Sequence, residues 1–162
     1  MKRLIPLWKA VVLVWLASIG PVFAAQMEFP GPYFGEVIRV IDGDTFEAKI
    51  EIWPTISATV SVRLKGVDAP ELRRSECPQE RLGAAEAKDA MEDILPMGTR
   101  VRLENVEKDA FAGRVVADVF KQGEVRGSTL TTLMIRRAMV LPWVPGDPDI
   151  DWCNDDSVVQ DN

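Results

Sequence analysis

Two short stretches of the sequence place carboxylates close together in tight turns, and these residues have the clearest potential for chemistry. Asp42 and Asp44 are separated by one glycine, and Asp68 and Glu71 by an alanine and a proline. Proline fixes its own φ and favours an extended residue before it, so the second turn is stiff. Calcium takes about six to eight oxygen ligands, and carboxylates on such turns can supply several of them.

Either turn alone is also an ordinary structural signal. An Asp-Gly pair between apolar runs is typical of a β-hairpin, and Asp-Ala-Pro-Glu is an acceptable turn without any metal. Their joint occurrence on either side of Arg63 favours a functional site. Val62 and Leu64 alternate with Arg63, so a strand here directs the arginine away from the core.

The lack of histidine restricts the chemistry that such a site can perform. The 162-residue chain contains none. Hydrolysis of a phosphodiester needs an activated water, neutralised charge on phosphorus and a protonated leaving oxygen. Carboxylate, metal and arginine would have to supply these functions. Arginine suits the phosphate because its planar fork contacts two oxygens at once and keeps its proton.

Three segments resemble, in order and spacing, the signature segments of the staphylococcal nuclease family, a group of thermonuclease-like enzymes. They are residues 41–45 (Ile-Asp-Gly-Asp-Thr), 63–71 (Arg-Leu-Lys-Gly-Val-Asp-Ala-Pro-Glu) and 109–114 (Asp-Ala-Phe-Ala-Gly-Arg). The resemblance covers roughly residues 34–143. It implies a calcium ion bound by the side chains of Asp44 and Asp68 and by the backbone carbonyl of Ala69.

The resemblance also implies which residues act on the substrate. Glu71 would activate or orient water, and whether it is a true general base stays open. Arg63 and Arg114 would bind the phosphate. Asp42 either supports the metal ligands or is simply the turn residue of a hairpin, and the sequence favours neither interpretation.

Two departures from the family bear on metal and substrate binding. The family has threonine where this chain has Ala69, which is tolerable if only the carbonyl binds the metal, and tyrosine where this chain has Phe111. Lys108, Phe111 and Trp143 are the candidate substrate-binding residues. Trp143 would either stack on a base, a contact worth about 1–3 kcal/mol, or pack against the fold, and both interpretations stay open.

The full set of acidic and basic residues predicts a calcium-dependent endonuclease. It would hydrolyse DNA, RNA or both with little base specificity and leave 3′-phosphate ends, as the resemblance implies. We expect a monomer whose partner is nucleic acid. The alternative is a non-catalytic, nuclease-like binding module of the cell envelope, and the intact set of residues argues against it.

Hydrophobic periodicity predicts an α+β fold that is mainly β. The predicted order of three strands, a helix, two strands and a helix occupies residues 34–41, 45–52, 59–67, 79–95, 100–106, 114–120 and 129–138. We expect Leu82 on the core face of the first helix and Ser128 as the N-cap of the second. The order permits a five-stranded OB-type barrel with a helix between strands 3 and 4 and a C-terminal helix, and the resemblance implies one.

The chain divides into four predicted regions. They are a signal peptide at residues 1–24, an N-terminal linker at 25–33, a nuclease-like OB-fold domain at 34–144 and an acidic C-terminal tail with Cys153 at 145–162. A basic start, a short apolar run and small residues before a cut after Ala24 or Ala25 predict the signal peptide. The product would be exported, either periplasmic or secreted, without stable membrane association after the cut.

The predicted export of the chain bears on the state of its two cysteines. Cys77 and Cys153 are the only ones, and an even count in an oxidising compartment favours one disulfide. A metal site at these cysteines would lack further ligands, because there is no histidine. Closing so long a loop contributes on the order of 4 kcal/mol in the chain-entropy model.

The formal net charge of −6 is unusual for an enzyme that acts on nucleic acid. The acidity is concentrated, because six aspartates lie within the last 16 residues. Net charge governs long-range steering, whereas a local patch can still attract phosphate. The patch expected here consists of Arg73, Arg74, Lys108 and Arg114.

Overall fold

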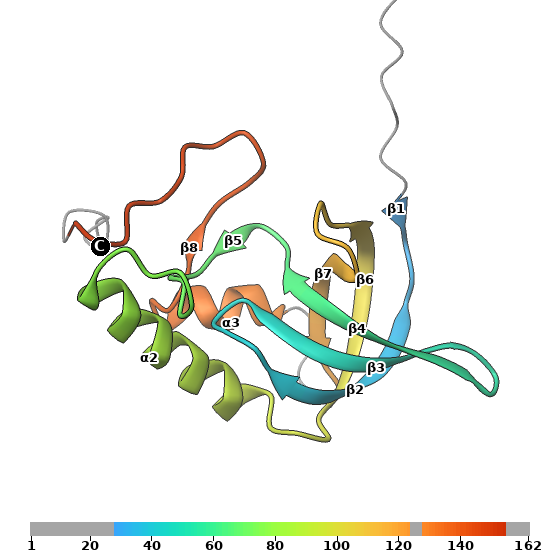
Figure 1. Ribbon diagram of the computed structural model, residues 1–162. Helices are drawn as coiled ribbons and strands as arrows, with labels where there is room; N and C mark the ends of the chain where they lie inside the picture. Colours follow the sequence, from blue (N-terminus) through green and yellow to red (C-terminus); the bar gives the residue numbers. More distant parts are fainter. Residues whose placement is uncertain (1–27, 124–127, 155–162) are drawn as a thin grey trace, which may run out of the picture.

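The computed structural model describes residues 28–123 and 128–154. The predicted signal peptide and the end of the predicted tail lie outside the described residues. The elements are β1 (Glu28–Phe29), β2 (Tyr33–Val40), β3 (Thr45–Trp53), β4 (Ile56–Leu64), β5 (Val67–Asp68), α2 (Pro78–Ile94), β6 (Arg100–Lys108), β7 (Arg114–Lys121), α3 (Leu130–Arg136) and β8 (Leu141–Pro142) (Figure 1).

Five strands close into a mixed barrel. β2, β3 and β4 form an antiparallel meander, and β4 then pairs in parallel with β7. β7 pairs with β6, and β6 returns to β2, so the sheet has no gap. The two helices lie outside this barrel (Figure 1). The predicted OB-type α+β fold is therefore confirmed.

The core lies inside the barrel because alternate side chains of each strand point inward. In β3, Phe46, Ala48 and Ile50 are buried, whereas Lys49 between them is exposed. Val62 and Leu64 of β4 join the same cluster. Burial of apolar surface at roughly 25 cal/mol per Å² makes this interior the main stabilising contribution.

α2 packs one narrow stripe against the barrel. Ala84, Ala87, Met91 and Ile94 are buried, and they follow the spacing of three and four residues that a helix face requires. Leu82 is 67% exposed, so its predicted position on the core face is wrong. Two residues before Ala84, it lies on the opposite side of the helix.

α3 begins one residue later than the sequence predicts. Its N-cap is Thr129, whose hydroxyl oxygen accepts a hydrogen bond from the Thr132 amide at 3.1 Å. Ser128 is therefore not the cap. The helix buries Leu130 and Met134 against the barrel, as expected for a helix that closes one end of the core.

The ends of the described chain are tied to the barrel. β1 pairs with β6, so part of the predicted linker contributes a short strand, and the domain limits stay a prediction. The predicted disulfide is present and joins Cys77, the N-cap of α2, to Cys153 in the tail. Within the described residues, no helix has the length and apolar character needed to cross a membrane.

Candidate active site

The turn before β3 places Asp44 in the interior. The amides of Ile41 and Asp42 both donate to the carbonyl of Thr45, at 2.9 and 3.1 Å, which folds the turn back on itself. Gly43 lies against α2, where an added Cβ would come within 2.6 Å of the Ala87 Cβ. Only glycine permits this close approach. The turn therefore presses against the helix and carries Asp44 with it.

Asp44 is a buried carboxylate with too few partners. One oxygen, Oδ1, accepts from the Thr45 hydroxyl at 2.7 Å. The other, Oδ2, lies 2.7 Å from Arg63 Nη1 as an ion pair, but among the described residues it has no partner with hydrogen-bond geometry. Burial raises the pKa of Asp44 to about 8, although the charge of Arg63 opposes this rise. The ionised form therefore needs more positive charge than Arg63 supplies.

Arg63 lies between two carboxylates from different parts of the chain. From the end of β4, its Nη1 faces Asp44, and its Nη2 donates to Asp68 Oδ1 at 2.5 Å. Burial alone would lower the pKa of Arg63, but Asp44 and Asp68 raise it. The guanidinium is therefore charged and links the two predicted metal ligands.

Two of the predicted metal ligands, Asp68 and Ala69, lie at the end of β5 and directly after it. Asp68 pairs with Leu141 of β8 in a two-stranded sheet, which fixes its backbone beside the barrel end. Ala69 follows and is buried. The second oxygen of Asp68 accepts a hydrogen bond from Trp152 Nε1 at 3.2 Å. Sequence reasoning did not place Trp152 at the site, because the two residues are far apart in the chain.

Glu71 lies in the loop between β5 and α2, and it is exposed. Its amide donates to Glu80 Oε1 at 3.1 Å, and the Glu76 amide donates to Glu80 Oε2 at 2.5 Å. Glu80 is only 7% exposed, so one buried carboxylate holds two backbone amides of the loop. It stands three residues after the N-cap Cys77, but it accepts from the amides of Glu71 and Glu76, so it is not the glutamate of a capping box.

Arg114 is held by its own turn. Its Nε and Nη2 donate to Asp109 Oδ2 and Oδ1 at 2.8 and 3.3 Å. Burial alone would raise the pKa of Asp109, but the hydrogen bonds from Arg114 and from the Phe111 amide lower it. The Phe111 ring lies 4.6 Å from the guanidinium carbon of Arg114, within cation–π range.

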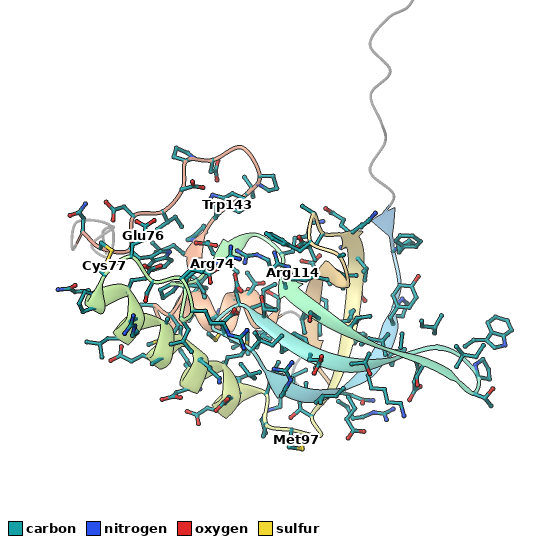
Figure 2. The ribbon with its side chains drawn as sticks, viewed as in Figure 1. Arg74, Glu76, Cys77, Met97, Arg114 and Trp143 are labelled. Atoms are coloured by element: carbon teal, nitrogen blue, oxygen red, sulfur yellow. A yellow bond between two sulfur atoms is a disulfide. The ribbon has the colours of Figure 1, made fainter. Side chains whose placement is uncertain are left out.

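The two arginines project from the same outer face of the barrel. In the parallel pairing of β4 and β7, Val62 and Leu64 face the core, opposite Val115 and Ala117. Residues that alternate with these point outward, and they include Arg63 and Arg114. Figure 2 shows Arg114 on the same side of the molecule as Arg74, with Met97 on the opposite side.

The remaining candidates are nearby in the fold but make no contact that assigns their role. Asp42 Oδ1 accepts a hydrogen bond from the Asp44 amide at 3.4 Å, and this contact fits both interpretations of Asp42. Lys108 is exposed at the end of β6. The indole N–H of Trp143 donates to the Pro148 carbonyl at 3.2 Å. Substrate contacts by Lys108, Phe111 and Trp143 stay predictions.

The residues present suit a divalent cation. Asp44 Oδ2 is a buried acceptor without a hydrogen-bond partner among the described residues, and hard cations prefer carboxylate and carbonyl oxygens. Cys77, Glu80 and Cys153 also lie together, but both sulfurs are used in the disulfide. The candidate cation site is therefore the one around Asp44 and Asp68, which Arg63 links.

A comparison with models of known protein families gives a match. A family model described as staphylococcal nuclease homologue matches residues 61–141, which is half of the chain. The matched range contains Arg63, Asp68, Glu71 and Arg114, and Asp44 lies before it. No curated protein matches the chain.

Proposed function

Because the chain belongs to the family of staphylococcal nuclease homologues, we propose that it is a metal-dependent nuclease that hydrolyses phosphodiester bonds in DNA, RNA or both. The observation that carries the proposal is the bridge of Arg63 between Asp44 and Asp68. Three charged residues from separate segments converge there, and the two carboxylates together carry more negative charge than the single arginine neutralises, which favours a cation beside them. Buried carboxylates with a raised pKa cluster at functional sites, which supports this proposal.

The cation we propose is calcium, held by the carboxylates of Asp44 and Asp68 and by the carbonyl of Ala69. When bound, it would neutralise charge on the phosphate and favour the ionised form of nearby water. Asp44 supports this assignment because burial raises its pKa and a second positive charge would return the carboxylate to its ionised form.

The side chains of this chain would divide the remaining functions. Arg63 and Arg114 bind the phosphate from one face, and their charge counts most when extra negative charge develops on phosphorus. Glu71 orients or deprotonates the attacking water from its exposed position on the loop that Glu80 holds. Asp109 keeps the Arg114 guanidinium in a fixed plane through two hydrogen bonds. We expect little base specificity and 3′-phosphate products.

The proposal also includes export. The predicted signal peptide at residues 1–24 and the disulfide between Cys77 and Cys153 are both features of exported proteins. We expect a periplasmic or secreted monomer that does not stay on the membrane. Intact-mass measurement of the protein recovered outside the cytoplasm should give a chain that begins at Ala25 or Gln26 and contains no free thiol.

One assay tests the proposed reaction. The oxidised protein is incubated with single-stranded DNA and with RNA, in calcium, magnesium or chelator. We expect cleavage in calcium and its loss in chelator. Cleavage that chelator does not affect, or a folded protein that binds oligonucleotide without cleaving it at any calcium concentration, contradicts the proposal. The second result would support the binding-module alternative.

A pair of variants tests the role of Glu71. Glu71→Gln keeps the size of the side chain and removes its charge and basicity, so turnover should fall by about 10²–10⁴ while oligonucleotide binding changes little. Glu76→Gln is the matched control, because Glu76 is an exposed glutamate of the same loop. Equal loss in both variants would show that the loop, and not Glu71, is responsible.

A further inference from the structure

The C-terminal tail returns to the candidate metal site. Trp152 is half-buried, and its indole Nε1 donates to Asp68 Oδ2 at 3.2 Å. The residue after it, Cys153, is bonded to Cys77 at the start of α2. The tail therefore contacts a predicted metal ligand although 84 residues separate Trp152 from Asp68.

Both oxygens of Asp68 have a donor, and the two donors come from different parts of the fold. Arg63 of β4 donates to Oδ1, and Trp152 of the tail donates to Oδ2. A carboxylate bonded at one oxygen can still rotate, whereas donors at both oxygens fix its plane. Each oxygen accepts more than one bond, so a cation can still bind. Asp68 is thus held in one orientation before any ligand arrives.

Two tethers keep Trp152 beside Asp68. On one side, β8 pairs with β5, placing Leu141 opposite Asp68 itself. On the other, the disulfide ties Cys153 to Cys77. The Cys153 amide also donates to Asp151 Oδ1 at 2.9 Å, which folds the chain locally around Trp152. If the disulfide is opened, Trp152 loses its tether through Cys153, and of these two tethers the one through β8 remains.

We propose that Trp152 is a positioning residue for the Asp68 carboxylate, and that the disulfide between Cys77 and Cys153 makes this contact permanent. The tail is thereby part of the metal site. The proposal rests on the proposed function, since it takes Asp68 to be a metal ligand. Groups that hydrogen-bond to metal ligands typically contribute about 10–100-fold to metal affinity, so loss of the indole N–H should weaken calcium binding by that factor.

The first test measures calcium affinity directly. Isothermal titration calorimetry with calcium compares the parent, Trp152→Phe and the control Trp53→Phe, whose side chain is 71% exposed on the β3–β4 hairpin. We expect Trp152→Phe to raise the dissociation constant about 10–100-fold and Trp53→Phe to leave it unchanged. Turnover of Trp152→Phe at saturating calcium should approach that of the parent, because the residue orients a ligand and does not touch the substrate.

The second test asks whether the disulfide acts through Trp152. The double variant Cys77→Ser/Cys153→Ser removes the bond and keeps an N-cap oxygen for α2. It should lose as much calcium affinity as Trp152→Phe, and adding Trp152→Phe to it should cost little more. Such non-additivity in a double-mutant cycle identifies a shared contact. Removal of the disulfide should lower the melting temperature in either case, but a purely structural effect would leave the two losses of calcium affinity additive.

The outcomes separate this inference from the proposed function. A parent that binds no calcium overturns both. A parent that binds calcium with a Trp152→Phe variant of equal or higher affinity overturns the inference alone, and higher affinity would make the tail an inhibitory cover. Loss in Trp152→Phe without loss in the cysteine double variant overturns the role of the disulfide.

Discussion

The two arginines of the candidate site have the same chemistry and are held in opposite ways. Arg63 is 16% exposed and lies between Asp44 and Asp68, which come from other segments of the barrel. Arg114 is 24% exposed and bonds to Asp109, five residues earlier in its own turn. The position of Arg63 depends on the assembled fold, whereas the position of Arg114 is determined by a single loop.

Because of this difference, we expect the two arginines to contribute unequally to stability although both contribute to catalysis. Arg63 connects the turn before β3 to β5, so its hydrogen bonds help to hold those segments together. Arg114 closes the turn between β6 and β7, and these two strands already pair with each other. We therefore expect both arginines to matter for turnover, and only Arg63 to matter strongly for folding.

The largest effect is expected for Arg63→Ala. Loss of a phosphate ligand should lower turnover by about 10²–10³. Loss of its charged hydrogen bonds should also lower the free energy of unfolding by about 1.5–3 kcal/mol. Urea denaturation in chelator measures the second quantity without interference from metal. An unchanged unfolding free energy would mean that the bridge between Asp44 and Asp68 does not stabilise the barrel.

Arg114→Ala should lower turnover about as much, by roughly 10²–10³, but should cost less than about 1 kcal/mol of stability, as partly exposed ion pairs do. The comparison of unfolding free energies with Arg63→Ala is the decisive measurement. If both variants also cleave at near the parent rate, the two arginines are structural and the binding-module alternative replaces the nuclease.

The contrast between local and long-range contacts also explains which features the sequence could predict. Alternation of apolar residues identified the barrel strands, since it is a local property of each segment. The candidate site residues were predicted because Asp44, Arg63 and Arg114 each belong to a short motif that resembles a known family. Glu80 was missed because it bonds the amides of Glu71 and Glu76, and no local sequence pattern indicates these contacts.

Other features could not be read from the sequence because they depend on distant contacts. The hydrogen bond from Trp152 to Asp68 joins residues that no local pattern connects. β1 has only two residues, too few for alternation to be recognised. Leu82 was placed on the core face because an apolar residue was assumed to be buried. The barrel instead covers only a narrow stripe of α2.

A third prediction concerns the close approach that buries Asp44. Gly43→Ala adds a Cβ 2.6 Å from that of Ala87, and overpacking of this kind costs about 1–3 kcal/mol. The turn must move, so the ion pair between Asp44 and Arg63 should weaken and calcium affinity should fall. Because Arg114 has no part in this contact, its stacking on Phe111 should persist.

Gly83→Ala is the control for that substitution. Its added Cβ would lie at an ordinary 3.5 Å from Pro70, and alanine favours a helix interior by up to about 1 kcal/mol. We expect equal or higher thermal stability and parent calcium affinity. If Gly43→Ala also keeps the thermal stability and calcium affinity of the parent, the turn can move without weakening the ion pair between Asp44 and Arg63. The position of Arg63 would then depend less on the assembled fold than we expect.

The smallest effect is expected at Phe111, which is 60% exposed and stacks on Arg114. Phe111→Leu keeps an apolar side chain and removes the ring, so it should lose an exposed cation–π contact of about 0.5–1 kcal/mol. Turnover should then fall only about two- to fivefold. Phe111→Tyr keeps the ring and should match the parent in steady-state cleavage assays. A large loss in Phe111→Leu, comparable to that in Arg114→Ala, would show that Asp109 alone does not hold this arginine. Arg114 would then be held by both Asp109 and the Phe111 ring, whereas Arg63 is held by carboxylates from other segments of the fold.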